Sequence, residues 1–171
     1  MRSEAGPGRS TQILYGALAG FAATALMTSA MWRLHRRLPE EERYPLPPRE
    51  ITDRVLVAAE DDVVRDTAMT SHFLYGALAG ALICAVRPPR NVAEGGLAGL
   101  AVWAGSYFGW VPALGILRPA SDHPPRRNAL MIMVHLIWGS VTALTMRELL
   151  DARRTILNGR PPEDAVLEAR P

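Results

Sequence analysis

Two histidines lie well inside apolar stretches of the chain, and they are the residues whose type and position could support chemistry. His72 begins the sequence His-Phe-Leu-Tyr-Gly and His135 begins the sequence His-Leu-Ile-Trp-Gly, so the pattern His-apolar-apolar-aromatic-Gly occurs twice. An imidazole changes charge near neutral pH and can also ligate a metal. Ionisable side chains are costly inside a membrane and give reason to look for a function. We therefore take His72 and His135 as the candidate pH-sensing or ligand pair.

Three interpretations of this pair are open from the sequence. In the first, neutral imidazoles form hydrogen bonds between helices near the ends of the apolar stretches. In the second, the pair senses acid or relays protons. In the third, two parallel helices hold a metal or haem between the imidazoles, and zinc would need further ligands, with His35, His123 or the acidic loop as candidates. We favour the first interpretation, so we predict no metal site and no cofactor.

Motifs of known enzyme classes are absent from the sequence. There is no Gly-rich phosphate loop, no His-Glu-x-x-His and no Gly-x-Ser-x-Gly. Cys84 is the single cysteine, so no disulfide can form within one chain. The net charge of +2 is too small to indicate a nucleic-acid partner. We expect a protein that is not an enzyme and has no catalytic residues.

Four apolar runs organise the chain, at residues 12–32, 67–86, 95–117 and 128–146. A helix of about 20 residues, rising about 1.5 Å per residue, crosses the roughly 30 Å hydrocarbon core of a bilayer. We therefore predict an all-α integral membrane protein with four transmembrane helices in one domain, residues 12–146. Residues 1–11 are predicted to form a flexible tail and residues 147–171 a charged tail. The basic segment 32–37 favours a retained span at 12–32 over a cleaved signal peptide.

The connections between these runs differ in length. The long first loop contains a predicted short amphipathic helix from Glu50 to Ala59, with Ile51, Val55 and Ala58 on one face. The short link at 87–94 predicts that the second and third spans are antiparallel neighbours. Pro112 predicts a kink in the third span, where neighbouring helices would satisfy the freed backbone groups.

Small residues four positions apart recur in every span. On a helix such residues share one face and allow two backbones to approach closely. We predict that these faces hold the bundle together, with dimerisation as the alternative. In the third span this places the glycines inside and the aromatic side chains of Trp103, Tyr107 and Trp110 toward lipid or a second subunit. The predicted packing glycines are Gly16, Gly20, Gly76, Gly80, Gly95, Gly99, Gly105, Gly109 and Gly139.

The repeated His-x-x-aromatic-Gly pattern also suggests a duplicated helical hairpin. In this hypothesis the first span corresponds to the third and the second to the fourth, so that His72 and His135 occupy matching positions at similar depth. The identical sequence Leu-Tyr-Gly-Ala-Leu-Ala-Gly at 14–20 and 74–80 does not fit that scheme. A composition rich in Ala, Gly and Leu can produce such a match by chance.

Two stretches of the chain resemble a known family. The segment 44–49, Tyr-Pro-Leu-Pro-Pro-Arg, together with His-Leu-Ile-Trp at 135–138 and Met-Arg-Glu-Leu at 146–149, is similar to the YagU-like family of small bacterial inner-membrane proteins. The resemblance implies a multi-pass protein of the bacterial inner membrane. It implies no catalytic residues, because no biochemical activity is assigned to that family.

The expected function follows from these observations. We predict a non-enzymatic membrane protein with a structural, interaction or envelope-stress role. Its predicted partners are the lipid bilayer and, in a homo-oligomer, further copies of the same chain. One alternative is an oligomeric small transporter or proton or ion pathway that uses His72 and His135. A further alternative is a haem- or metal-binding membrane protein. Arginines are divided almost evenly between the two sides, so the orientation in the membrane is left open.

Overall fold

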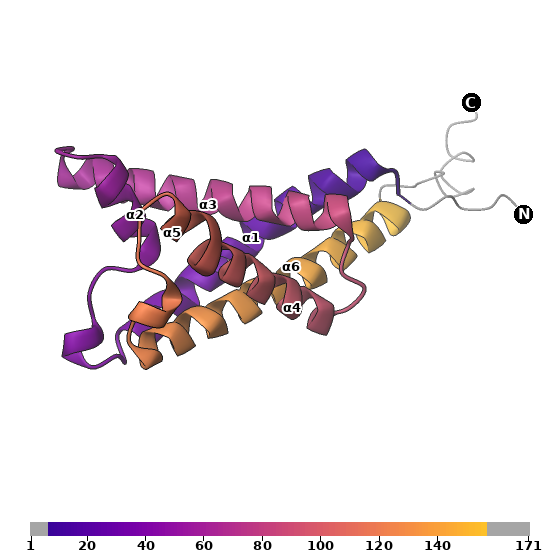
Figure 1. The fold of residues 1–171 in the computed structure, drawn as a ribbon. Coiled ribbons are helices and arrows are strands. Elements are labelled where there is room, and N and C mark those ends of the chain that lie inside the picture. Colours follow the sequence, from indigo (N-terminus) through magenta and orange to yellow (C-terminus); the bar gives the residue numbers. More distant parts are fainter. Residues whose placement is uncertain (1–6, 157–171) are drawn as a thin grey trace, which may run out of the picture.

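The computed structural model describes residues 7–156, and within that range every regular element is helical (Figure 1). The three longest helices are α1 (Arg9–His35), α3 (Asp61–Val86) and α6 (Pro125–Thr155). The third apolar run forms α4 (Val92–Gly105), η2 (Ser106–Trp110) and α5 (Val111–Ala113). The shorter elements are η1 (Glu40–Glu42), α2 (Pro47–Val55) and η3 (Ala120–Asp122). Most of the two predicted tails, residues 1–6 and 157–171, lies outside the described residues.

Three helices, α1, α3 and α6, are long and apolar enough to cross a membrane. They contain the runs predicted at 12–32, 67–86 and 128–146, and each extends beyond its run at one end or both. Large apolar side chains remain exposed on their outer faces. Examples are Leu14, Leu18 and Phe21 on α1 and Leu74, Leu78 and Leu82 on α3. A helix that is apolar both inside and outside the bundle is typical of a membrane span.

The third apolar run is interrupted, as Pro112 predicted. A proline has no N–H to donate to the preceding turn. A π-turn forms over Ser106–Trp110, before the proline. Within it, Gly109 has the non-helical angles φ −109° and ψ −111°. Beyond the proline, the N–H of Ile116 donates to the carbonyl of Val111 at 3.1 Å, which again spans five residues. The helical path therefore widens at η2 and ends at Ala113.

The helices are arranged as two tightly packed pairs, α1 with α3 and α4 with α6, and α1 also packs on α6. The prediction that the second and third spans are direct neighbours is therefore wrong for α4, whereas η2 contacts α3 at Tyr75. A short link joins the end of α3 to α4, but α3 packs along α1 and α4 along α6 (Figure 1). The small residues of α3 face α1, and those of α4 face α6. This arrangement leaves space between α3 and the C-terminal part of the third run.

The predicted amphipathic helix exists but is shifted toward the N-terminus. α2 begins at Pro47, where a proline is well tolerated because the first N–H groups of a helix have no partner. It ends at Val55, and Ala58 has a φ of 65°, which is incompatible with the predicted continuation to Ala59. Thr52 is buried, whereas Val55 is 62% exposed. The buried face therefore differs from the predicted one.

Candidate functional site

A cavity of about 360 Å³ lies between α1, α3, α6 and the interrupted third run. Its volume lies within the range of small-molecule sites, which begins at roughly 300 Å³. Residues of α2, among them Pro47 and Ile51, line it at one end. Leu74, Leu78 and Trp110 line it and are also exposed, so it is open to the outer surface at these residues. No Asp, Glu, Lys or Arg is among the lining residues.

Both candidate histidines line this cavity. His135 is 8% exposed, and its Nδ1 lies 2.7 Å from the carbonyl oxygen of Met131. Because a carbonyl oxygen can only accept, Nδ1 is the donor, and in the neutral ring Nε2 is then an acceptor. Nε2 of His72 is buried without a hydrogen-bond partner.

Two of the other polar side chains around the cavity, Tyr75 and Ser106, are hydrogen-bonded to each other. The hydroxyl of Ser106 donates to the carbonyl of Val102 at 2.8 Å, so the hydroxyl of Tyr75 is the donor in its 2.8 Å bond to Ser106. This bond joins α3 to η2 across the space between them. The two histidines provide hydrogen-bonding positions in the cavity that are still free, at Nε2 of each ring.

Close glycine contacts fix the first helix pair. A Cβ added at Gly16 would lie 2.6 Å from the carbonyl oxygen of Gly80, and one added at Gly20 would meet the carbonyl of Gly76. The backbones of α1 and α3 touch here, as the predicted faces require. The indole N–H of Trp138 on α6 donates to the carbonyl of Gly20 at 3.1 Å, which ties α6 to the same crossing.

The second pair repeats this arrangement. A Cβ at Gly95 would meet the carbonyl oxygen of Gly139 and the Cβ of Ala143, and a Cβ at Gly99 would meet the carbonyl of His135. In the first pair the corresponding atoms are the Gly80 carbonyl, the Cβ of Cys84 and the Gly76 carbonyl. The two crossings therefore have the same set of close contacts.

This correspondence differs by one helical turn from the one that the repeated sequence pattern suggests. Gly80 and Gly139 play the same part in their crossings, which makes His135 equivalent to Gly76 and not to His72. His72 therefore lies one turn farther from its crossing than His135 does. The expectation that the two histidines occupy matching positions is wrong with respect to the crossings, although both reach the same cavity.

Gly105 and Gly109 do not join a helix contact. A Cβ at either position would meet nothing within 4 Å, so they face open space. The neighbouring Tyr107 is instead 7% exposed and belongs to the hydrophobic core. The predicted placement, glycines inside and aromatics outside, is wrong for Tyr107 and holds only for Trp110, which is 41% exposed. The π-turn at η2 rotates the face of the third run after α4.

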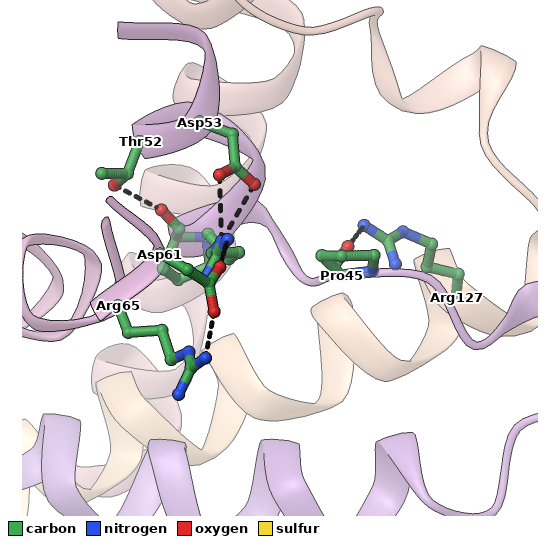
Figure 2. A network of polar contacts seen from close by, with 8 residues as sticks. Pro45, Thr52, Asp53, Asp61, Arg65 and Arg127 are labelled. Atoms are coloured by element: carbon green, nitrogen blue, oxygen red, sulfur yellow. Dashed lines mark hydrogen bonds and ion pairs between the residues drawn. The ribbon is translucent and has the colours of Figure 1, made fainter. Parts of the chain in front are cut away.

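A buried arginine at the start of α6 holds the segment that precedes α2. The side chain of Arg127 donates to the carbonyls of Tyr44 at 3.1 Å and Pro45 at 2.6 Å and to a carboxylate oxygen of Glu50 at 2.6 Å. Its guanidinium also lies 3.7 Å from the centre of the Tyr44 ring. Figure 2 shows Arg127 reaching Pro45. Sequence reasoning missed this role, since Arg127 looked like one of many basic residues flanking a span.

A second polar network ties α2 to the start of α3. Arg49 forms a 3.0 Å ion pair with Asp53, and Asp61 bridges Arg49 and Arg65 (Figure 2). These groups are partly or largely exposed, so water screens each pair and each contributes little to stability. Together the two networks hold α2 over the end of the cavity.

The additional metal ligands considered from the sequence lie outside the cavity. Among residues 7–156, no group of three or more His, Cys, Asp or Glu side chains is placed to hold a metal ion. His35 and His123, the additional ligands considered from the sequence, are not among the residues that line the cavity. Instead, His35 bonds the carbonyl of Tyr44 at 3.0 Å and His123 bonds the hydroxyl of Tyr44 at 3.0 Å.

Comparisons of the chain with protein-family models, curated proteins and solved structures found no match.

Proposed function

We propose that this chain is a non-enzymatic, multi-pass membrane protein that binds an uncharged, lipid-soluble small molecule in the cavity between its helices. In this proposal α4, η2 and α5 together make a fourth, interrupted crossing. The bacterial inner membrane, implied by the resemblance to the YagU-like family, is the proposed location. The duplicated hairpin is also retained as a proposal, and the matching contacts of the two glycine crossings support it.

The observation that carries the proposal is the cavity itself. Its lining is mainly apolar and contains no charged side chain, so an apolar molecule gains from entering it while an ion would lose its hydration. Leu74, Leu78 and Trp110 mark the place where it meets the outer surface. On a membrane span that surface faces lipid, from which a lipid-soluble molecule would enter directly.

The alternative of a proton or ion pathway has less support. Such a path needs a continuous series of polar groups or water, whereas the lining of the cavity is mainly apolar. The neighbouring hydroxyls of Tyr75 and Ser106 are bonded to each other. A binding role for the cavity is also compatible with the interaction role predicted from the sequence.

The binding proposal is tested with hexylbenzene, a neutral apolar probe. We expect saturable binding of the labelled probe, one per chain, in equilibrium dialysis against protein-free micelles. At about 100 times its Kd the probe should raise the free energy of unfolding by about 2.7 kcal/mol. The full chain in detergent is used throughout. Uptake equal to that of empty micelles would refute the proposal.

Two variants on α3 make this test specific. Ser71 is exposed and lines the cavity, so Ser71→Phe places a ring at its mouth and should abolish the saturable component. Leu82 is 65% exposed and is not among the lining residues, so Leu82→Phe should bind like the wild type. Equal binding by both variants would place the probe elsewhere.

The proposed number of crossings is tested separately with reporter fusions. Four crossings put residues 1–8 and 156–171 on the same side of the membrane, whereas three put them on opposite sides. Reporters fused at the two ends should therefore agree, and one inserted near Glu41 should report the other side. Disagreement between the two ends would remove the fourth crossing.

A further inference from the structure

The two histidines of the cavity differ in the hydrogen bonds they still lack. Nδ1 of His135 is occupied by the Met131 carbonyl, so Nε2 of the neutral ring offers an acceptor. Nε2 of His72 is buried and has no partner, although it could act as a donor. Leaving a buried polar atom unpaired costs free energy, and such an atom in a native protein calls for an explanation.

The chemistry of the missing partner follows from these two positions. A carbonyl or ether can accept a hydrogen bond from His72 but cannot donate one to His135. A hydroxyl can do both. A carboxylate, phosphate or ammonium group would bring a charge into a cavity whose lining contains no opposite charge.

We propose that the ligand is a neutral alcohol or phenol whose hydroxyl group donates to Nε2 of His135 and accepts from Nε2 of His72. This inference rests on the proposed binding function and names the class of molecule. The apolar body of the ligand fills the rest of the cavity and leaves it at Leu74, Leu78 and Trp110. Each histidine positions the hydroxyl, and no bond of the ligand is made or broken.

The experiment compares three probes that share the same apolar body. 4-Hexylphenol carries a hydroxyl, 4-hexylanisole carries an ether that can accept but not donate, and hexylbenzene carries neither. Binding to the full chain is measured in the same detergent, and the Ser71→Phe variant provides the baseline for uptake by micelles. We expect the phenol to bind about tenfold more tightly than hexylbenzene, and the anisole to lose most of that advantage.

Variants of the two histidines locate the effect. His135→Leu should reduce the preference for the phenol over hexylbenzene to near parity, and His72→Leu should reduce it by about fivefold. Both should still bind hexylbenzene, which also reports that the cavity is intact. If His135→Leu fails to fold, His72→Leu decides the question, because Nε2 of His72 has no protein partner to lose.

The possible failures are distinguishable. If the wild type binds the phenol and hexylbenzene equally, or if a folded histidine variant keeps the full preference, this inference is wrong while the binding function stands. If the wild type binds none of the probes, the proposed function fails as well. Equal affinity for the anisole and the phenol would contradict donation to His135 in particular.

Discussion

Nη2 of Arg127 lies 2.6 Å from Oε2 of Glu50, a residue 77 positions earlier in the chain. The arginine side chain is 2% exposed and that of Glu50 20% exposed. The pair joins the first turn of α6 to α2, which lines the end of the cavity. The position of α2 at the end of the cavity therefore depends on one buried ion pair and on the carbonyls that are bonded to the same guanidinium.

Removal of Arg127 is expected to destabilise the fold strongly. Arg127→Met leaves the carboxylate of Glu50 and the carbonyl of Pro45 without this donor, which should lower the free energy of unfolding by about 3 kcal/mol. Thermal unfolding in detergent, followed by circular dichroism, measures the loss. Arg65→Met is the matched control, because its pair with Asp61 is exposed and screened by water, so its loss should change stability little. Similar losses in both variants would contradict the special role of Arg127.

The sequence predicted those parts of the fold that depend on local patterns. Runs of about 20 apolar residues predicted the helices α1, α3 and α6, because the length of a span is a local requirement. Pro112 predicted the interruption of the third run, because a proline inside a helix removes a hydrogen bond to the preceding turn. The close contacts of Gly16, Gly20 and Gly80 also follow from a spacing of four.

Other features depend on partners far away in the chain, and the sequence did not reveal them. Gly105 and Gly109 have the same spacing as the packing glycines, but the π-turn between them turns their face away from any helix. The repeated histidine pattern predicted matching positions for His72 and His135. In the structure, His72 lies one helical turn farther from its glycine crossing than His135 does. The sequence could not predict that both histidines line one cavity, because the cavity depends on how α3 and α4 separate.

The crossing of α1 and α3 provides a second prediction. Gly80→Ala adds a methyl group against the backbone carbonyl of Gly16, which cannot move without separating the helices. Overpacking of this kind costs about 1–3 kcal/mol, so the midpoint of thermal unfolding should fall clearly. Gly105→Ala is the control. Its methyl group meets nothing, and the higher helix propensity of Ala should leave the stability unchanged or raise it by up to about 1 kcal/mol. A loss in the control and none at Gly80 would reverse the argument.

The indole of Trp138 provides a third prediction. Its N–H donates to the carbonyl of Gly20 at 3.1 Å and lies 3.2 Å from the hydroxyl of Thr24. Trp138→Phe keeps an aromatic ring but removes this donor, and we expect a loss of about 1 kcal/mol in the free energy of unfolding. The carbonyl of Gly20 keeps a bond from the Thr24 hydroxyl, which limits the loss. A change above about 3 kcal/mol would mean that the volume of the indole dominates.

The phenol of Tyr44 makes stability depend on alkaline pH. Its hydroxyl lies 3.0 Å from Nδ1 of His123, and Nε2 of that ring faces the carbonyl of Arg118, so the phenol is the donor. Burial raises the pKa of Tyr44 above its ordinary value of 10.0, and the charge of Arg127 opposes this only in part. The folded protein therefore holds this proton more tightly than the unfolded chain does. The corresponding stability is fully present below pH 10.0 and is lost as the pH rises through the folded pKa.

Tyr44→Phe tests this dependence directly, since phenylalanine has no proton to lose. Free energies of unfolding are measured for both proteins in detergent between about pH 9 and pH 11, where the arginines keep their charge. We expect the stability of the wild type to fall relative to that of Tyr44→Phe across this interval. At about pH 9 the wild type should be the more stable of the two, because it retains the bond to His123. A difference between the two proteins that stays constant over the whole interval would show that Tyr44 has the same pKa in the folded and unfolded states.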